Sequence, residues 1–333
     1  MRSLLKSLAS LRLTMVGLTG LIANSVAISQ WPDAAIPWLV APLSLLAVNL
    51  FAALLVRHAF RHQAALLLFH VGLLAVLMLV VVGVLLRFDG SVEVIEGEAF
   101  NAGAVTVRGA GWLHPDRLDR ISFTQGPLEV RYRSGFQRDT TLSRVIVERE
   151  GEAGVRREIG DRQGFTAHGY RFMTTFNKGY SVLVLWRGSG GEEVIGAVNF
   201  PSYPSFDWKQ VNDWTTPAGE TMTFELLLAE RVPDDSPWKL SSNDARYTVG
   251  LTGGSRAGET VAPGQSLAVE GGEITILDLR LWMGYRIDYN PLLPWLLTAA
   301  FLSLAALAVH MAQKFRAPRA VDPVPACGGE QAA

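Results

Sequence analysis

Residues Ala64–Leu86 read AALLLFHVGLLAVLMLVVVGVLL, and His70 is the only titratable side chain among them. A helix needs about 20 consecutive apolar residues to cross the hydrocarbon core of a bilayer, so this run predicts a membrane-spanning helix. An ionisable side chain inside such a span costs roughly 2.5–3.5 kcal/mol even on lenient insertion scales, and it usually has a function. The sequence therefore makes His70 the first candidate functional residue.

Three other stretches are long and apolar enough to span a membrane, namely Leu13–Ile28, Ile36–Val56 and Leu292–Met311. The chain of 333 residues is 49% hydrophobic and 18% charged, and most of its charges lie between the third and fourth stretches. We therefore predict an integral membrane protein with four transmembrane α-helices, three N-terminal and one C-terminal, embedded in a lipid bilayer.

The basic residues near the predicted spans indicate an orientation. They gather before the first span, between the second and third, and after the fourth: Arg2, Lys6, Arg12, Arg57, Arg61, Lys314, Arg316 and Arg319. Short loops that are rich in Lys and Arg stay in the cytoplasm. Both termini are therefore expected inside, and the long polar segment between the third and fourth spans is expected outside.

That long segment, residues 87–290, has the pattern of β-structure. Short stretches of alternating apolar and polar residues recur in it, rich in β-branched and aromatic side chains: Ser91–Ile95, Val105–Val107, Leu128–Tyr132, Val145–Val147, Tyr180–Trp186, Thr223–Leu227, Tyr247–Val249 and Ile274–Leu277. We predict a large all-β extracytoplasmic domain, a sandwich or an open barrel with room for two lobes. The predicted organisation is three helices in 1–86, the β domain in 87–290, the fourth helix in 291–313 and a disordered cytoplasmic tail in 314–333.

Several classes of function are disfavoured by the same sequence. The outer segment carries 22 Lys and Arg against 28 Asp and Glu, which gives no reason to expect nucleic acid as a partner. The single cysteine, Cys327, lies in the predicted tail, so the outer domain has no thiol chemistry. No nucleophile–base arrangement or phosphate loop occurs, and we expect no catalysis by the chain alone.

Imidazole is well suited to bind haem iron axially, because a neutral ring brings a nitrogen ligand without a charge. For His70 the simpler alternative is helix packing, with a hydrogen bond to Asn49 or Ser44 of the second span. His310, near the cytoplasmic end of the fourth span, is a second candidate ligand. Its simpler interpretation is an interfacial residue beside Lys314.

The remaining histidines are weaker candidates. His58 and His62 are spaced for one helix face, but they stand in a basic loop and make a poor metal site. His114 and His168 have no neighbouring ligands in sequence, and we interpret both as structural. A proline-punctuated aromatic stretch is the candidate for partner docking, with Phe200, Tyr203, Phe206 and Trp208.

Several motifs, in this order, resemble the ResB family (also called CcsB), the membrane subunit of the system II apparatus for cytochrome c maturation. They are Leu8–Leu13 before the first span, Phe69–Leu74, Phe88–Glu98, Leu128–Tyr132 with Ser143–Val147 and His168–Phe172, and Asp288–Pro291 before the last span. The resemblance extends over nearly the whole chain. Its individual motifs are short, and their order and topology carry most of its weight.

The resemblance implies a protein of the bacterial cytoplasmic membrane that works with a CcsA (ResC)-like membrane protein. Together such proteins move haem across the membrane and present it to apocytochrome c. The histidine of the third span is a haem ligand in that family, and here that position is His70. Two alternatives remain: a membrane-anchored β-domain scaffold of a respiratory or transport complex without its own haem, and a self-contained b-type haem protein that uses His70 and His310.

Overall fold

The protein is described by a computed structural model for residues 2–31, 35–57, 60, 63–149, 152–161, 163–230, 232, 235–243 and 245–316. It divides into two compact units, Met1–Leu85 with Pro291–Ala333, and Leu86–Asn290. The first unit is helical and the second is built from antiparallel β-sheets. Four of the described helical segments are long and apolar enough to cross a membrane: Leu11–Gln30, Ile36–Val56, Ala64–Leu86 and Leu293–Phe315. The predicted membrane protein with a large β domain is confirmed at this level.

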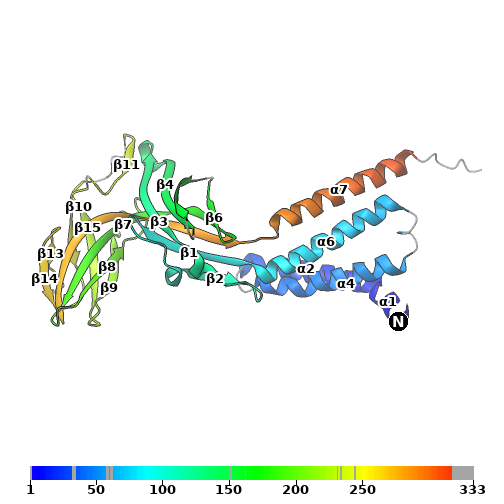
Figure 1. Cartoon of the computed structure of the whole chain (residues 1–333), viewed down its shortest axis with the longest axis horizontal. Coiled ribbons are helices and arrows are strands. Elements are labelled where there is room, and N and C mark those ends of the chain that lie inside the picture. Colours follow the sequence, from blue (N-terminus) through cyan, green and yellow to red (C-terminus); the bar gives the residue numbers. More distant parts are fainter. Residues whose placement is uncertain are drawn as a thin grey trace, which may run out of the picture. The chain divides into compact units, whose positions relative to one another are not determined.

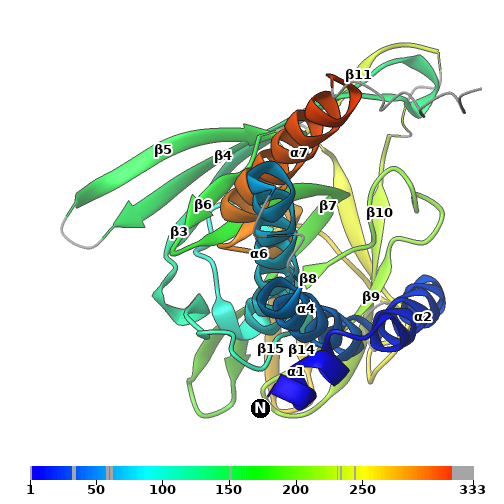
Figure 2. The same ribbon diagram turned by 90° about the vertical axis from the view of Figure 1, so that its right-hand side faces the viewer.

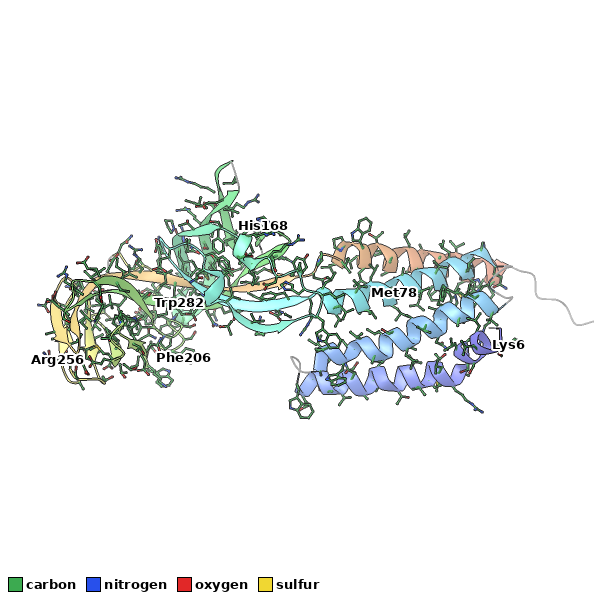
Figure 3. The ribbon with its side chains drawn as sticks, turned by 60° about the horizontal axis from the view of Figure 1, so that its bottom comes forward. Lys6, Met78, His168, Phe206, Arg256 and Trp282 are labelled. Carbon is green, nitrogen blue, oxygen red and sulfur yellow. The ribbon has the colours of Figure 1, made fainter. Side chains whose placement is uncertain are left out.

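The helical unit contains five α-helices and one 3₁₀ turn within the described residues. They are α1 (Arg2–Leu8), α2 (Leu11–Gln30), the turn η1 (Ile36–Leu39), α4 (Val40–Val56), α6 (Ala64–Leu86) and α7 (Leu293–Arg316). The break between α1 and α2 is stabilised by Ser10, whose Oγ accepts a hydrogen bond of 3.4 Å from the Leu13 backbone N–H. The long helices follow one another in the order α7, α6, α4 and α2 (Figures 2 and 3).

The end of α7 corrects the predicted start of the tail. Residues 314–316 continue the helix rather than beginning a disordered segment. Proline disfavours a helix at its own position and at the residue before it, and the first proline after the span is Pro318. The helix can therefore continue to residue 316. The rest of the predicted tail, with Cys327, lies outside the described residues, as do His58 and His62.

The β unit contains fifteen strands in three antiparallel sheets within the described residues (Figure 1). Seven strands form the large sheet: β1 (Phe88–Ile95), β2 (Thr106–Ala110), β6 (Phe165–Ala167), β7 (Tyr170–Gly188), β8 (Glu193–Asn199), β14 (Ser266–Val269) and β15 (Gly272–Tyr289). A second sheet holds β3 (Phe123–Tyr132), β4 (Arg138–Arg149), β5 (Glu152–Gly160) and β11 (Trp238–Leu240). The third holds β9 (Val211–Thr215), β10 (Thr221–Leu228), β12 (Tyr247–Leu251) and β13 (Thr260–Val261). Three short 3₁₀ turns complete the unit: η2 (Ala102–Ala104), η3 (Leu118–Arg120) and η4 (Ser134–Phe136).

Two long strands, β7 and β15, run through the whole β unit and pair with each other along nearly their full length. One half of this pair is flanked by β1 and β6, and the other half by β8 and β14. Between the halves the register shifts at Met283–Tyr285, where Thr175 Oγ1 donates a hydrogen bond of 3.0 Å to the Gly284 carbonyl. Such a bulge bends a strand and changes its twist. The unit thus has two lobes that share β7 and β15, a first lobe around β1 and β6 and a second lobe around β8 and β14.

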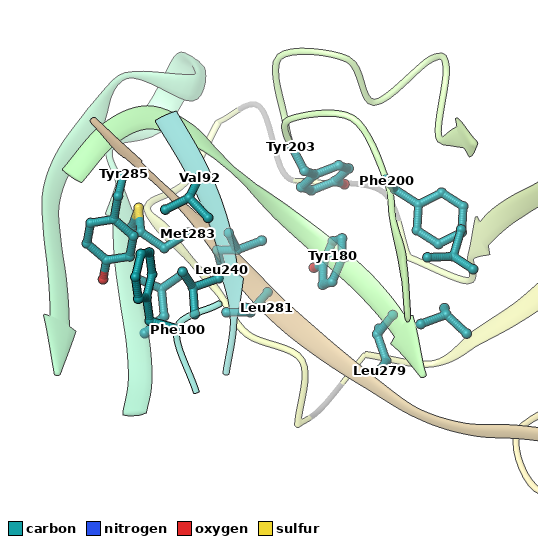
Figure 4. Packing of buried hydrophobic residues seen from close by; sticks show 14 of the residues in the cluster. Val92, Phe100, Tyr180, Phe200, Tyr203, Leu240, Leu279, Leu281, Met283 and Tyr285 are labelled. Atoms are coloured by element: carbon teal, nitrogen blue, oxygen red, sulfur yellow. The ribbon is translucent and has the colours of Figure 1, made fainter. Parts of the chain in front are cut away.

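The buried core extends through both lobes. In the first lobe the aromatic rings of Phe123, Phe165 and Phe172 pack together, with centroids 4.8–5.3 Å apart. In the second lobe alternate residues of β10, such as Met222 and Phe224, are buried in the same cluster. Figure 4 shows part of this packing around β7 and β15. Each predicted strand falls within a strand of the structure, except that Val105 precedes β2. Leu277 lies in β15, at a shift of its register with β7.

Candidate functional site

His70 is half-buried on α6, one helical turn after Leu66. Its Nδ1 lies 2.8 Å from the Leu66 backbone carbonyl oxygen. Two aromatic rings border the imidazole: Phe60 with its centroid at 4.6 Å, and Phe69 in an edge-on arrangement at 4.9 Å. The imidazole is therefore oriented by its own helix and by aromatic contacts.

The hydrogen bond to Leu66 decides which nitrogen carries the proton. A backbone carbonyl only accepts hydrogen bonds, so Nδ1 of His70 must be the donor. In the neutral ring Nε2 then keeps its lone pair. Histidines that bind metals typically have this arrangement, in which the other ring nitrogen donates to a carbonyl or carboxylate and fixes the tautomer. Nε2 of His70 is thus prepared to act as a ligand.

The packing alternative for His70 named Asn49 and Ser44, and the structure does not pair either with the ring. Asn49 Nδ2 donates hydrogen bonds to the backbone carbonyls of Leu8 and Ser10, at 2.6 and 3.0 Å. Its Oδ1 accepts a bond of 2.8 Å from Thr14. Within the described part of the chain, the Leu66 carbonyl is the one hydrogen-bond partner of the His70 ring.

His310 is half-buried on α7. Ser303 of α7 lies at the level of Phe69 of α6, because its Oγ donates a hydrogen bond of 3.1 Å to the Phe69 carbonyl. His310 follows Ser303 by two helical turns, which is about 10 Å at 1.5 Å per residue. The contacts of the His70 ring within the described residues are with Leu66, Phe60 and Phe69, and His310 is not among them.

The proposed docking stretch is only half exposed. Phe200 and Tyr203 are 1% and 5% exposed. The prediction that these two side chains face a partner is therefore wrong. Figure 4 shows Tyr203 beside Tyr180, with ring centroids 5.1 Å apart, because the loop folds back on β7. Phe206 and Trp208 do lie at the surface of the second lobe.

The two histidines of the β unit differ in their surroundings. His114 Nε2 lies 2.8 Å from the Tyr170 hydroxyl, and its ring stacks on Phe88 at 4.9 Å. Burial lowers the pKa of His114 below its ordinary value, which keeps the ring neutral at pH 7. His168 is exposed in the turn between β6 and β7. Among the residues that the structure describes, no group of three His, Cys, Asp or Glu is placed to hold a metal ion.

Lys178 is an unusual buried residue of β7. It is only 2% exposed, and its Nζ donates a hydrogen bond of 3.3 Å to the Phe176 carbonyl. Burial is the main cause that lowers its pKa to about 8. Lys178 is in phase with Tyr180, Val182 and Val184 along β7. Extending the predicted alternating stretch by two residues towards the N-terminus would therefore have predicted that Lys178 points inward.

A comparison with models of known protein families finds no match to this chain, and a comparison with curated proteins finds no significant relative. The site thus rests on its own geometry. That geometry leaves Nε2 of His70 as the ring nitrogen able to accept, on a helix long and apolar enough to span a membrane.

Proposed function

We propose that this protein is a ResB-like subunit of a system II cytochrome c maturation complex, which helps to move haem across the membrane and deliver it to apocytochrome c. The observation that carries this proposal is the hydrogen bond from His70 Nδ1 to the Leu66 carbonyl. It leaves Nε2 as a ligand inside the span where the ResB resemblance implies a haem-binding histidine.

The surroundings of His70 fit a haem ligand. The ring is half-buried and bordered by Phe60 and Phe69, which give the apolar surface that a porphyrin needs. In the most apolar 18-residue window of α6, only 6% of the residues are buried within this chain. The helix therefore has free surface for a neighbouring membrane protein. When bound, haem supplies the iron that is delivered, and His70 would hold it from one side.

The second axial ligand is proposed to come from a CcsA-like partner. His310 lies about two helical turns from the level of His70, as measured from Ser303. The His310→Ala variant below decides between a ligand from the partner and a haem held by both histidines of this chain. We further propose that the chain lies in the bacterial cytoplasmic membrane with the β domain outside and both termini inside, because the basic residues near the spans favour that orientation.

The test is His70→Ala in the full complex, with the partner protein co-expressed. We expect haem that co-purifies with the complex to fall at least tenfold, and mature cytochrome c to fall with it. Added imidazole should restore part of both, since a free ligand can occupy the space left by the ring. Insertion into the membrane should be unimpaired, because an ionisable group has been removed from the apolar span.

His310→Ala is the matched control, since it removes a second histidine from a membrane span. We expect it to keep haem content within twofold of the unchanged protein. Full haem content and normal cytochrome c in His70→Ala would make His70 a packing residue. The membrane-anchored scaffold without haem would then be the better interpretation.

A further inference from the structure

A tight turn between β2 and η3 exposes two large apolar side chains. The His114 backbone N–H donates a hydrogen bond of 3.0 Å to the Gly111 carbonyl, which closes the turn over Trp112 and Leu113. Trp112 is 83% exposed and Leu113 is 59% exposed. Turn tips are usually polar, so an exposed Trp-Leu pair at one is available for a contact outside this chain.

Both ends of this turn are attached to residues near the membrane spans. At one end, the Gly111 N–H donates a hydrogen bond of 2.8 Å to the carbonyl of Arg87, the residue that directly follows α6. Consecutive Cα atoms are 3.8 Å apart, so Trp112 lies within roughly 10 Å of the point where the third span ends.

At the other end, the His114 ring contacts the pair of residues that closes the β1–β15 ladder. It stacks on Phe88 at 4.9 Å and meets Tyr289 edge-on at 5.4 Å. Phe88 and Tyr289 are paired across the two strands. Phe88 comes two residues after the third span and Tyr289 four residues before α7 begins. The turn is therefore fixed beside the chain segments that connect to both spans.

The chemistry of the two side chains matches the lipid headgroup region. Trp is enriched where membrane and water meet, because its ring is apolar while its indole N–H stays polar. Leu113 adds apolar area that gains free energy on leaving water. We infer that Trp112 and Leu113 insert into the lipid leaflet at which α6 ends, and that the Gly111–His114 turn anchors the β domain to the membrane surface.

The inference is tested with spin labels on the full-length chain in lipid nanodiscs of phosphatidylcholine and phosphatidylglycerol. With Cys327→Ser as the background, Trp112→Cys is labelled and its exposure to oxygen and to a water-soluble nickel chelate is measured. Oxygen concentrates in the bilayer and the nickel chelate in water. The label at 112 should therefore collide at least threefold more often with oxygen than with the chelate.

Trp208→Cys is the matched control, since Trp208 is an equally exposed tryptophan of the second lobe. Its label should collide more often with the chelate. If the label at 112 also collides more often with the chelate, the turn is in water and the inference is wrong. A label at 112 that is shielded from both reagents would indicate burial against protein, which also overturns it. Where Trp112→Cys fails to fold, Leu113→Cys provides the same measurement.

Discussion

Ser303 in α7 donates a hydrogen bond of 3.1 Å to the backbone carbonyl of Phe69 in α6, next to His70. Gly72 permits this approach, because a Cβ at that position would clash with Ser303 Oγ and lie 3.1 Å from the Ser303 Cβ. Small residues commonly let membrane helices come this close. This contact fixes the position of α7 along α6, and it lies next to the candidate ligand His70.

The first prediction follows from this crossing. In a Cys327→Ser background, Gly72→Cys with Ser303→Cys should form a disulfide on mild oxidation, since the two Cβ positions lie 3.1 Å apart and a disulfide needs about 3.5–4.5 Å, which a small shift of the helices provides. Gly83→Cys with Ser303→Cys is the control, because no atom lies within 4 Å of a Cβ at Gly83. The product is seen as a gel shift that reductant reverses. Equal cross-linking of both pairs would contradict the crossing.

Asn49 connects α4 to the break between α1 and α2, where it bonds Leu8, Ser10 and Thr14. Asn49→Leu should lower the free energy of unfolding of the helical unit by about 1–3 kcal/mol, because two backbone carbonyls lose their partner. Thr14→Ala removes one of the three bonds and should cost less. Unfolding in mixed micelles, as the fraction of denaturing detergent is raised, measures the stability of both variants. An Asn49→Leu protein as stable as the unchanged one would show that these bonds add nothing.

Lys178 should make the stability of the β domain depend on pH. Its pKa is about 8 when folded and has an ordinary value of 10.5. Between these values the unfolded chain binds more protons, so stability rises with pH, by up to about 1.4 kcal/mol per unit. Lys178→Met should remove this rise from pH 7.5 to 9.5, and the exposed Lys209→Met should keep it. Urea unfolding followed by pulse proteolysis measures the effect. A flat profile in the unchanged protein would count against it.

Tyr285 belongs to a buried ring of hydrogen bonds in the first lobe. Its hydroxyl donates to Gln125 Oε1 at 2.5 Å and lies 2.9 Å from Ser143 Oγ, while Gln125 Nε2 donates to Ser143 at 2.8 Å. Tyr285→Phe should cost about 1–3 kcal/mol, because buried polar atoms lose a partner. Tyr180→Phe should cost less, since that hydroxyl makes only a long bond of 3.4 Å to Ser241. The same proteolysis assay compares the two variants.

The orientation of the chain gives a fifth prediction. A reporter inserted at Gly190, in the turn between β7 and β8, should be active only outside the cytoplasm. A reporter fused after Val56 should be active only inside. Alkaline phosphatase and a fluorescent protein that folds only in the cytoplasm report the two sides. Cytoplasmic behaviour at Gly190 would reverse the orientation and remove the basis for haem export.

The sequence was informative wherever a local pattern decides the structure. The length of each apolar run predicts a membrane span, because every backbone polar group must be satisfied within lipid. Alternation predicts strands, because successive side chains point to opposite faces of a sheet. These two rules placed His70 inside a span and located the β domain between two spans.

Contacts between distant residues were decided only by the tertiary structure. Alternation does not say which strands pair, so the long β7–β15 ladder that joins both lobes had no signal in the sequence. Phe200 and Tyr203 looked like surface residues because prolines surround them, yet the loop packs them on β7. The proton position on His70 depends on the orientation of its ring towards Leu66. Composition and periodicity report what a residue prefers, whereas pairing, burial and ring orientation depend on which parts of the chain meet.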